Sequence, residues 1–307
     1  MPQKNLKPCK KMPVLTLWTL KWLRQGTNAI ITMIKKDKFS PTVFSQYDIS
    51  YVKNGNALQK FDWHCPKKIM GDTLSPTPTI FYIHGGAWAS ADKKIYTRLC
   101  KDFCERDFVV ININYRLIPE VTLEDTYEDC LKAIKFCLKN SAKFGIDKDK
   151  LIIGGDSAGA HLAALIAGKV SMNKLFLNGK IVGTVLLYGL FNLNHMADSK
   201  FAILPPLHKG FKASKCLNLK RFYHDYSPIY YVTDKFPPSF LSAGKIDNIS
   251  AETIEFLEVL KQKGVKTQSI IFPADRKDAR HAFINLNNPA RQETVMAIGK
   301  SLLDFIK

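Results

Sequence analysis

The chain has 307 residues, of which 46% are hydrophobic and 23% charged, so it is long enough to bury a large core without disulfides or metals. This composition excludes a disordered chain, a collagen and a small disulfide scaffold. The formal net charge of +18 is uneven, because residues 1–38 hold nine basic groups and one acidic group. A basic surface favours anionic partners, although a lysine-rich surface that only confers solubility is the simpler interpretation.

The basic N-terminal segment, residues 1–40, precedes the main domain. Its apolar part, residues 14–34, is interrupted near the middle by Lys21, Arg24, Gln25 and Asn28, and no signal-peptide cleavage site follows. We favour a helix that covers the main domain as part of a cap. The alternative is an amphipathic helix that lies on an anionic membrane surface through residues 12–36.

From Pro41 onwards, strand-like and helix-like stretches alternate. A strand pair flanks Asn54-Gly55, and further strands are expected at 79–84, 107–114, 151–156, 181–189, 239–244 and 266–273. Helices are expected at 92–106, 123–140, 157–170, 250–263 and about 289–306. This alternation predicts an α/β fold, with a mostly parallel central sheet and helices on both faces. Residues 190–235 interrupt the alternation of strands and helices. This interruption predicts a cap insertion within a domain of residues 41–307.

The segment Gly155-Asp156-Ser157-Ala158-Gly159 joins an expected strand to an expected helix, which is the context of a nucleophile elbow. A residue on so tight a turn has a strained backbone, and a side chain at either glycine would collide with the neighbouring strand and helix. The helix N-terminus leaves the Ala158 N–H free to face developing negative charge. Ser157 is therefore the predicted nucleophile, and Asp156 is assigned no catalytic role.

A second motif, HGGAW (84–88), follows another expected strand. Two adjacent glycines let the backbone approach a ligand and direct N–H groups at it. We expect the N–H groups of Gly85, Gly86 and Ala158 to form an oxyanion hole for a tetrahedral intermediate. The two residues that follow the glycines are expected to contact substrate: Ala87 and Trp88.

Together, HGGAW (84–88) and GDSAG (155–159) resemble the α/β-hydrolases of the hormone-sensitive-lipase-like carboxylesterase group, near the kynurenine-formamidase-like branch. Supporting stretches include NYRLIPE (114–120) and SPIYYV (227–232), and the resemblance covers about residues 70–305 in chain order. It implies an α/β-hydrolase fold and the chain order nucleophile, acid, base.

That order implies Asp247, after the strand 239–244, as the acid and His281 as the base. His281 would take the Ser157 proton and return it to the leaving group, while Asp247 would orient the imidazole and stabilise its cation. Asp247 would also suit a helix N-cap, and Asp275 and Asp278 lie closer to His281 in sequence. We prefer Asp247 because of its position after a strand.

The motifs predict a serine esterase that cleaves small carboxylic esters through an acyl-enzyme. The alternatives are a formamidase or amidase, a sugar-ester deacetylase, or an esterase at a membrane surface. We expect a small-molecule ester as partner, no cofactor, no metal, and no nucleic acid, since no nucleic-acid-binding module is recognisable. Seven cysteines without a CxxC pattern indicate a reducing compartment and a cytoplasmic location. The natural substrate and the oligomeric state are left open.

Overall fold

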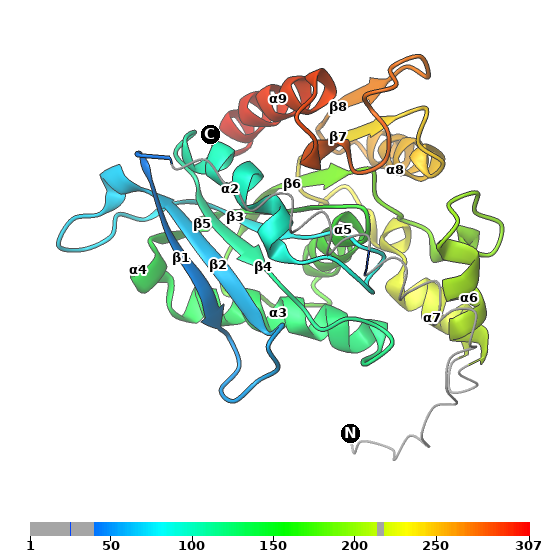
Figure 1. The fold of residues 1–307 in the computed structure, drawn as a ribbon, viewed down its shortest axis with the longest axis horizontal. Coiled ribbons are helices and arrows are strands. Elements are labelled where there is room, and N and C mark those ends of the chain that lie inside the picture. The colour runs from blue at the N-terminus through cyan, green and yellow to red at the C-terminus, as the bar shows by residue number, and fades with distance from the viewer. Residues whose placement is uncertain (1–24, 26–39, 214–217) are drawn as a thin grey trace.

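The computed structural model describes residue 25 and residues 40–213 and 218–307. Within these residues, eight strands form one sheet in the order β1-β2-β4-β3-β5-β6-β7-β8 (Figure 1). Their bounds are β1 (Val43–Ser50), β2 (Lys60–Pro66), β3 (Thr77–Ile83), β4 (Val109–Ile113), β5 (Ile146–Asp156), β6 (Ile181–Leu187), β7 (Ser239–Gly244) and β8 (Thr267–Phe272). The first two strands pair antiparallel, β2 pairs antiparallel with β4, and the remaining pairs are parallel. This is the mostly parallel sheet that the alternating pattern predicts.

Helices cover both faces of the sheet, with α3 and α9 on opposite sides (Figure 1). The bounds are α2 (Thr97–Cys104), α3 (Leu123–Lys139), α4 (Ser141–Phe144), α5 (Ala158–Ser171), α6 (Leu204–Ala213), α7 (Leu219–Tyr226), α8 (Ser250–Gln262) and α9 (Pro289–Phe305). Successive residues of β3 point to opposite faces: Phe81 joins the core beneath α3, α5 and α8, whereas Tyr82 joins the core beneath α2 and α9. Burial on both faces explains why the central parallel strands β3, β4 and β6 are mostly apolar runs.

The observed elements differ from the predicted ones mainly at their ends. The strand expected at 151–156 begins at Ile146, which pairs with Thr77 on β3. Residues 147–150, which lie before the predicted start of the strand, are polar and show no apolar pattern. Only the backbone pairing with β3 therefore reveals that the strand begins earlier. The helix expected at 92–106 is a 3-10 turn, η2 (Lys93–Tyr96), followed by α2. Asp92 caps that turn by accepting a hydrogen bond from the Lys94 N–H.

The predicted insertion lies between β6 and β7. It contains η3 (Leu193–Met196), α6, α7 and η4 (Pro228–Tyr231), and its apolar side chains are continuous with the core on the α3 and α5 side of the sheet. Its role as a cap stays a prediction. Residues 1–24 and 26–39, which hold nearly all of the predicted N-terminal cap segment and of the stretch 12–36, lie outside the described residues. Among the helices that are described, none has both the length and the apolar character that crossing a membrane requires.

Candidate active site

The predicted nucleophile lies on the turn between β5 and α5. Ser157 has a left-handed φ of 50° with ψ of −119°, a conformation that is strained for a residue with a side chain. A Cβ atom at Gly155 or at Gly159 would collide with the carbonyl oxygen of Ile83 on β3. The two glycines of the motif are therefore required by the close approach of the elbow to β3, as the sequence reasoning expected.

The structure brings the three predicted triad residues together. The Nε2 atom of His281 lies 2.9 Å from Ser157 Oγ, and its Nδ1 atom lies 2.7 Å from Asp247 Oδ2. The Asp247 side chain is 1% exposed and that of His281 is 20% exposed, so the acid is shielded while the base is open to a ligand. The three residues follow the carboxyl ends of β5, β7 and β8, at the edge of the sheet where α/β folds bind ligands.

Backbone contacts hold the acid and the base in place. Asp247 lies on a tight turn after β7, and its second carboxylate oxygen accepts a hydrogen bond from the Ile249 N–H at 3.1 Å. Gly244 packs so closely against Ala279 that a Cβ atom would collide with the Ala279 carbonyl oxygen. This contact joins the end of β7 to the loop that carries His281. Asp278, one of the two alternative acids, is instead bound to Arg276 and to the Ala290 N–H.

Two aromatic rings pack against the imidazole of His281. Tyr188, directly after β6, lies 5.0 Å from it between ring centroids, and Phe201, in the insertion, lies at 4.5 Å. Sequence reasoning missed both residues. The only signal for Phe201 was the aromatic character of the insertion, and no pattern pointed to Tyr188.

The loop after β3 has an unusual backbone. Gly86, Ala87 and Trp88 have successive positive φ values of 116°, 52° and 58°. Within residues 40–213 and 218–307, the N–H groups of Gly86, Ala87 and Ala158 donate to no acceptor. These N–H groups are the candidate oxyanion donors. The roles predicted for Gly86 and Ala158 stay predictions.

Gly85 is not a free donor, and its predicted place in the oxyanion hole is wrong. Its N–H donates to Asp156 Oδ1 at 2.9 Å and also lies 3.3 Å from the Tyr96 hydroxyl. The sequence motif shows that Gly85 and Gly86 are adjacent. It does not show which of their two N–H groups donates to the buried carboxylate of Asp156. The unpaired N–H of the neighbouring Ala87 is the better candidate.

Trp88 does not offer a surface to a substrate, which contradicts the predicted contact. It is 1% exposed, and its indole N–H donates to His161 Nδ1 at 3.3 Å. His161 in turn donates from Nε2 to the Tyr226 carbonyl at 2.7 Å, and burial lowers the pKa of His161 to about 4, so the ring is neutral. Trp88 thus braces the loop from inside the core. Ala87 is 8% exposed, and its contact with substrate stays a prediction.

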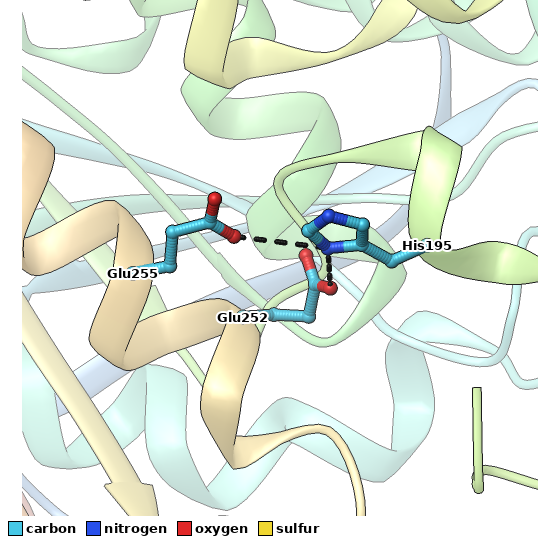
Figure 2. Close-up of side chains that lie close together, drawn as sticks. All are labelled: His195, Glu252 and Glu255. Carbon is cyan, nitrogen blue, oxygen red and sulfur yellow. Dashed lines mark hydrogen bonds and ion pairs between the residues drawn. The ribbon is translucent and has the colours of Figure 1, made fainter. Parts of the chain in front are cut away.

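A second group of ionisable side chains joins the insertion to α8 (Figure 2). His195 Nδ1 lies 2.6 Å from Glu252 and 3.7 Å from Glu255, and the ligand atoms of all three lie within 4.8 Å of one another. A divalent cation could span that distance. The atoms are already paired, however: the Asn192 amide donates to His195 Nε2 at 3.2 Å, and the Asn192 N–H donates to the other oxygen of Glu252. We interpret this group as a clamp that holds the insertion on α8.

The fold and the hydrogen-bonded Ser-His-Asp group define an α/β-hydrolase. The family described as BD-FAE matches residues 62–254, and the chain belongs to that family. It is 27% identical over 268 residues to the carboxylic ester hydrolase LipM of Mycobacterium tuberculosis, covering 84% of this chain and 60% of LipM. It is 28% identical over 237 residues to an arylesterase of Saccharolobus solfataricus, covering 74% of this chain and 75% of the arylesterase.

A solved structure of esterase B from Lactobacillus rhamnosis superposes with a TM-score of 0.82 at 19% identity, covering 95% of each chain. These comparisons confirm the predicted fold class and the predicted resemblance to hormone-sensitive-lipase-like carboxylesterases. The chain spans about three fifths of the length of several curated relatives that it matches.

Proposed function

We propose that this chain is a serine esterase that cleaves small carboxylic esters through an acyl-enzyme on Ser157. The observation that carries the proposal is the continuous hydrogen-bonded chain from Ser157 Oγ through His281 to Asp247, with distances of 2.9 and 2.7 Å. These distances lie within the range needed for proton transfer to a general base and for orientation of that base.

The chemistry follows from the roles of the three side chains. His281 takes the Ser157 proton as the hydroxyl oxygen attacks the ester carbonyl carbon, and Asp247 stabilises the imidazolium that forms. The N–H groups of Gly86, Ala87 and Ala158 bind the oxyanion. His281 then protonates the departing alcohol, and a water molecule, deprotonated by the same imidazole, hydrolyses the acyl-enzyme. None of these steps requires a cofactor or metal.

The comparisons support esters as the substrate class, because the relatives that match most of the chain are named as a carboxylic ester hydrolase and an arylesterase. The two rings beside His281, Tyr188 and Phe201, make its surroundings apolar and support small acyl or aryl groups. A formyl amide or a sugar acetate would need the same triad, so substrate assays must distinguish these alternatives.

Hydrolysis of p-nitrophenyl esters from acetate to palmitate, with N-formylkynurenine and an acetylated sugar in parallel, tests the proposal. We expect turnover of short esters by the wild type and its loss in Ser157→Ala. Preference for the formyl amide or for the sugar acetate would replace the ester proposal by that alternative. Equal rates for the wild type and Ser157→Ala on every substrate would contradict a serine hydrolase.

The cytoplasmic location of the chain and its association with a membrane surface both stay predictions. The five described cysteines are buried thiols, which supports a reducing compartment such as the cytoplasm: Cys65, Cys100, Cys104, Cys130 and Cys137. Attachment to an anionic membrane through residues 12–36 is tested by liposome sedimentation with and without residues 1–38. Binding that salt does not weaken, or no binding at all, would contradict it, because salt screens basic groups from a lipid surface.

A further inference from the structure

Asp156, the residue before the nucleophile, carries a buried carboxylate at the end of β5. The residue is 1% exposed, and three tyrosine hydroxyls and one backbone N–H lie within hydrogen-bond distance of its two oxygens. Oδ1 accepts from the Gly85 N–H at 2.9 Å and from Tyr82 at 3.2 Å, while Oδ2 accepts from Tyr96 at 2.9 Å and lies 3.5 Å from the Tyr188 hydroxyl. Several donors are what a buried carboxylate needs to stay ionised.

The donors come from four separate segments around the site. Tyr82 belongs to β3, Tyr96 to η2 and Tyr188 to the end of β6, whereas Gly85 begins the loop with the candidate oxyanion donors. A Cβ atom at Gly85 would lie 2.6 Å from Asp156 Oδ2, so only glycine permits this approach. The same carboxylate therefore holds the start of that loop and directly precedes the nucleophile in the chain.

We propose that Asp156 is a positioning residue that sets the oxyanion loop relative to Ser157. By binding the Gly85 N–H, its carboxylate fixes the peptide from which the left-handed turn at 86–88 starts, and leaves the N–H groups of Gly86 and Ala87 for the oxyanion. This proposal rests on the proposed serine hydrolase mechanism. An error of about 1 Å between a nucleophile and its partner groups can slow a reaction by about 100-fold, so a common anchor for both has kinetic value.

The charge of Asp156 adds a second effect. Burial raises the pKa of Asp156 to about 6. Hydrogen bonds from Tyr96, from the Gly85 N–H and from Tyr82 act in the opposite direction and lower this pKa, as does the nearby charge of His281. The ionisable groups that face the carboxylate are Tyr82 of β3, Tyr96 of η2, Tyr188 after β6 and His281 after β8. Above pH 6 the carboxylate is anionic and accepts strong hydrogen bonds from its donors. Below pH 6 it gains a proton and binds the Gly85 N–H less strongly.

The test compares the wild type with Asp156→Asn, which keeps the shape of the side chain and removes the charge. The readout is the second-order rate constant for labelling of Ser157 by a fluorophosphonate, measured from pH 5 to 9. This reaction uses the nucleophile, the base and the oxyanion donors without requiring an ester substrate. Inhibition by a trifluoromethyl ketone, which forms a tetrahedral adduct, is measured on the same samples.

We expect Asp156→Asn to lower the labelling rate constant by about 10- to 100-fold and to raise the inhibition constant of the ketone in parallel, because both depend on oxyanion donors. The fall in the wild-type rate constant that accompanies protonation of Asp156 near pH 6 should be absent from the acid limb of the variant, because asparagine does not titrate there. A wild-type rate constant with an unmoved acid limb would overturn the proposal.

Asp62→Asn is the matched control. Asp62 is also a buried carboxylate, but its partners are Lys93 at 2.7 Å and the Asp48 N–H at 2.8 Å, and no triad residue is among them. This variant should lose stability, because it breaks a buried ion pair, and should keep the labelling rate of the wild type. An equal loss of labelling in both variants would assign Asp156 a merely structural role.

Gly85→Ala tests the same contact from the other side if Asp156→Asn does not fold, since the added methyl group displaces the carboxylate. We expect the same fall in labelling, and a wild-type rate would overturn the proposal. Ester turnover is assayed on the same samples. A wild type that is labelled at Ser157 but hydrolyses no ester contradicts the proposed function, whereas the labelling rates still decide the role of Asp156.

Discussion

The ring of Phe201 lies against the imidazole of His281, with 4.5 Å between centroids and an angle of 51° between the planes. Phe201 belongs to the insertion between β6 and β7, whereas His281 follows β8. The clamp of His195, Glu252 and Glu255 holds the same part of the insertion on α8. The insertion therefore reaches the predicted base and can shape the space in which an ester lies.

Phe201→Ala should widen that space. We expect the preferred acyl chain to lengthen, and kcat/KM for a short ester to fall by about 3- to 10-fold as apolar contact is lost, mostly through KM. The p-nitrophenyl ester series measures both. Phe176→Ala is the control, because Phe176 is 80% exposed and lies outside the insertion. An unchanged chain-length preference in Phe201→Ala would show that this ring does not contact the acyl group.

Asp247→Asn should be far more harmful than Asp278→Asn. Loss of the carboxylate beside His281 Nδ1 removes the group that orients the base, and a fall in kcat of about 1,000- to 10,000-fold is the expected result. Asp278 is bound to Arg276 and to the Ala290 N–H, so its replacement should change kcat by less than about 5-fold. Comparing kcat for the two variants checks the assignment, and the reverse order would make Asp278 the acid.

Trp88→Phe should reduce stability rather than substrate affinity. The change removes the indole N–H that His161 Nδ1 accepts and leaves that nitrogen buried without its donor, which costs about 1–3 kcal/mol. KM should stay within about 2-fold of the wild type, since Trp88 has almost no exposed surface. Urea unfolding and steady-state kinetics measure the two quantities. A large rise in KM at unchanged stability would restore Trp88 as a substrate contact.

His161 should make the protein less stable below neutral pH. Burial lowers the pKa of His161 from 6.5 to about 4, so the unfolded chain takes up a proton as pH falls through 6.5 while the folded chain does not. The contribution of His161 to the free energy of unfolding is therefore fully present above pH 6.5. It is lost as the pH falls from 6.5 to 4. The full loss is about 3 kcal/mol.

His161→Gln should flatten this dependence, because glutamine can accept from Trp88 and donate to the Tyr226 carbonyl without titrating. Urea unfolding at pH 7.5, 6 and 5 gives the slope for each variant. His224→Gln, at an exposed histidine, is the control substitution. Equal slopes for the wild type and His161→Gln would mean that His161 does not carry this pH dependence.

Much of the site could be predicted from the sequence, because the local backbone conformation and its close packing allow only certain residue types at certain positions. Ser157 has a positive φ and lies so close to β3 that residues 155 and 159 must be glycine, and these constraints appear as GDSAG. Strands buried on both faces appear as continuous apolar runs, which reveals the parallel sheet. The resemblance of the motifs then indicated Asp247 and His281, which the structure places in one hydrogen-bonded chain with Ser157.

Only the tertiary structure decided where side chains and N–H groups point once distant segments pack together. The burial of Trp88 against His161 and the contact of Phe201 with His281 join parts of the chain that no local pattern relates. The same holds for Asp156, whose donors come from β3, η2 and the end of β6, and which takes the Gly85 N–H away from the oxyanion hole. A buried carboxylate selects its partners by proximity in the folded core, and that proximity arises only when the sheet has formed.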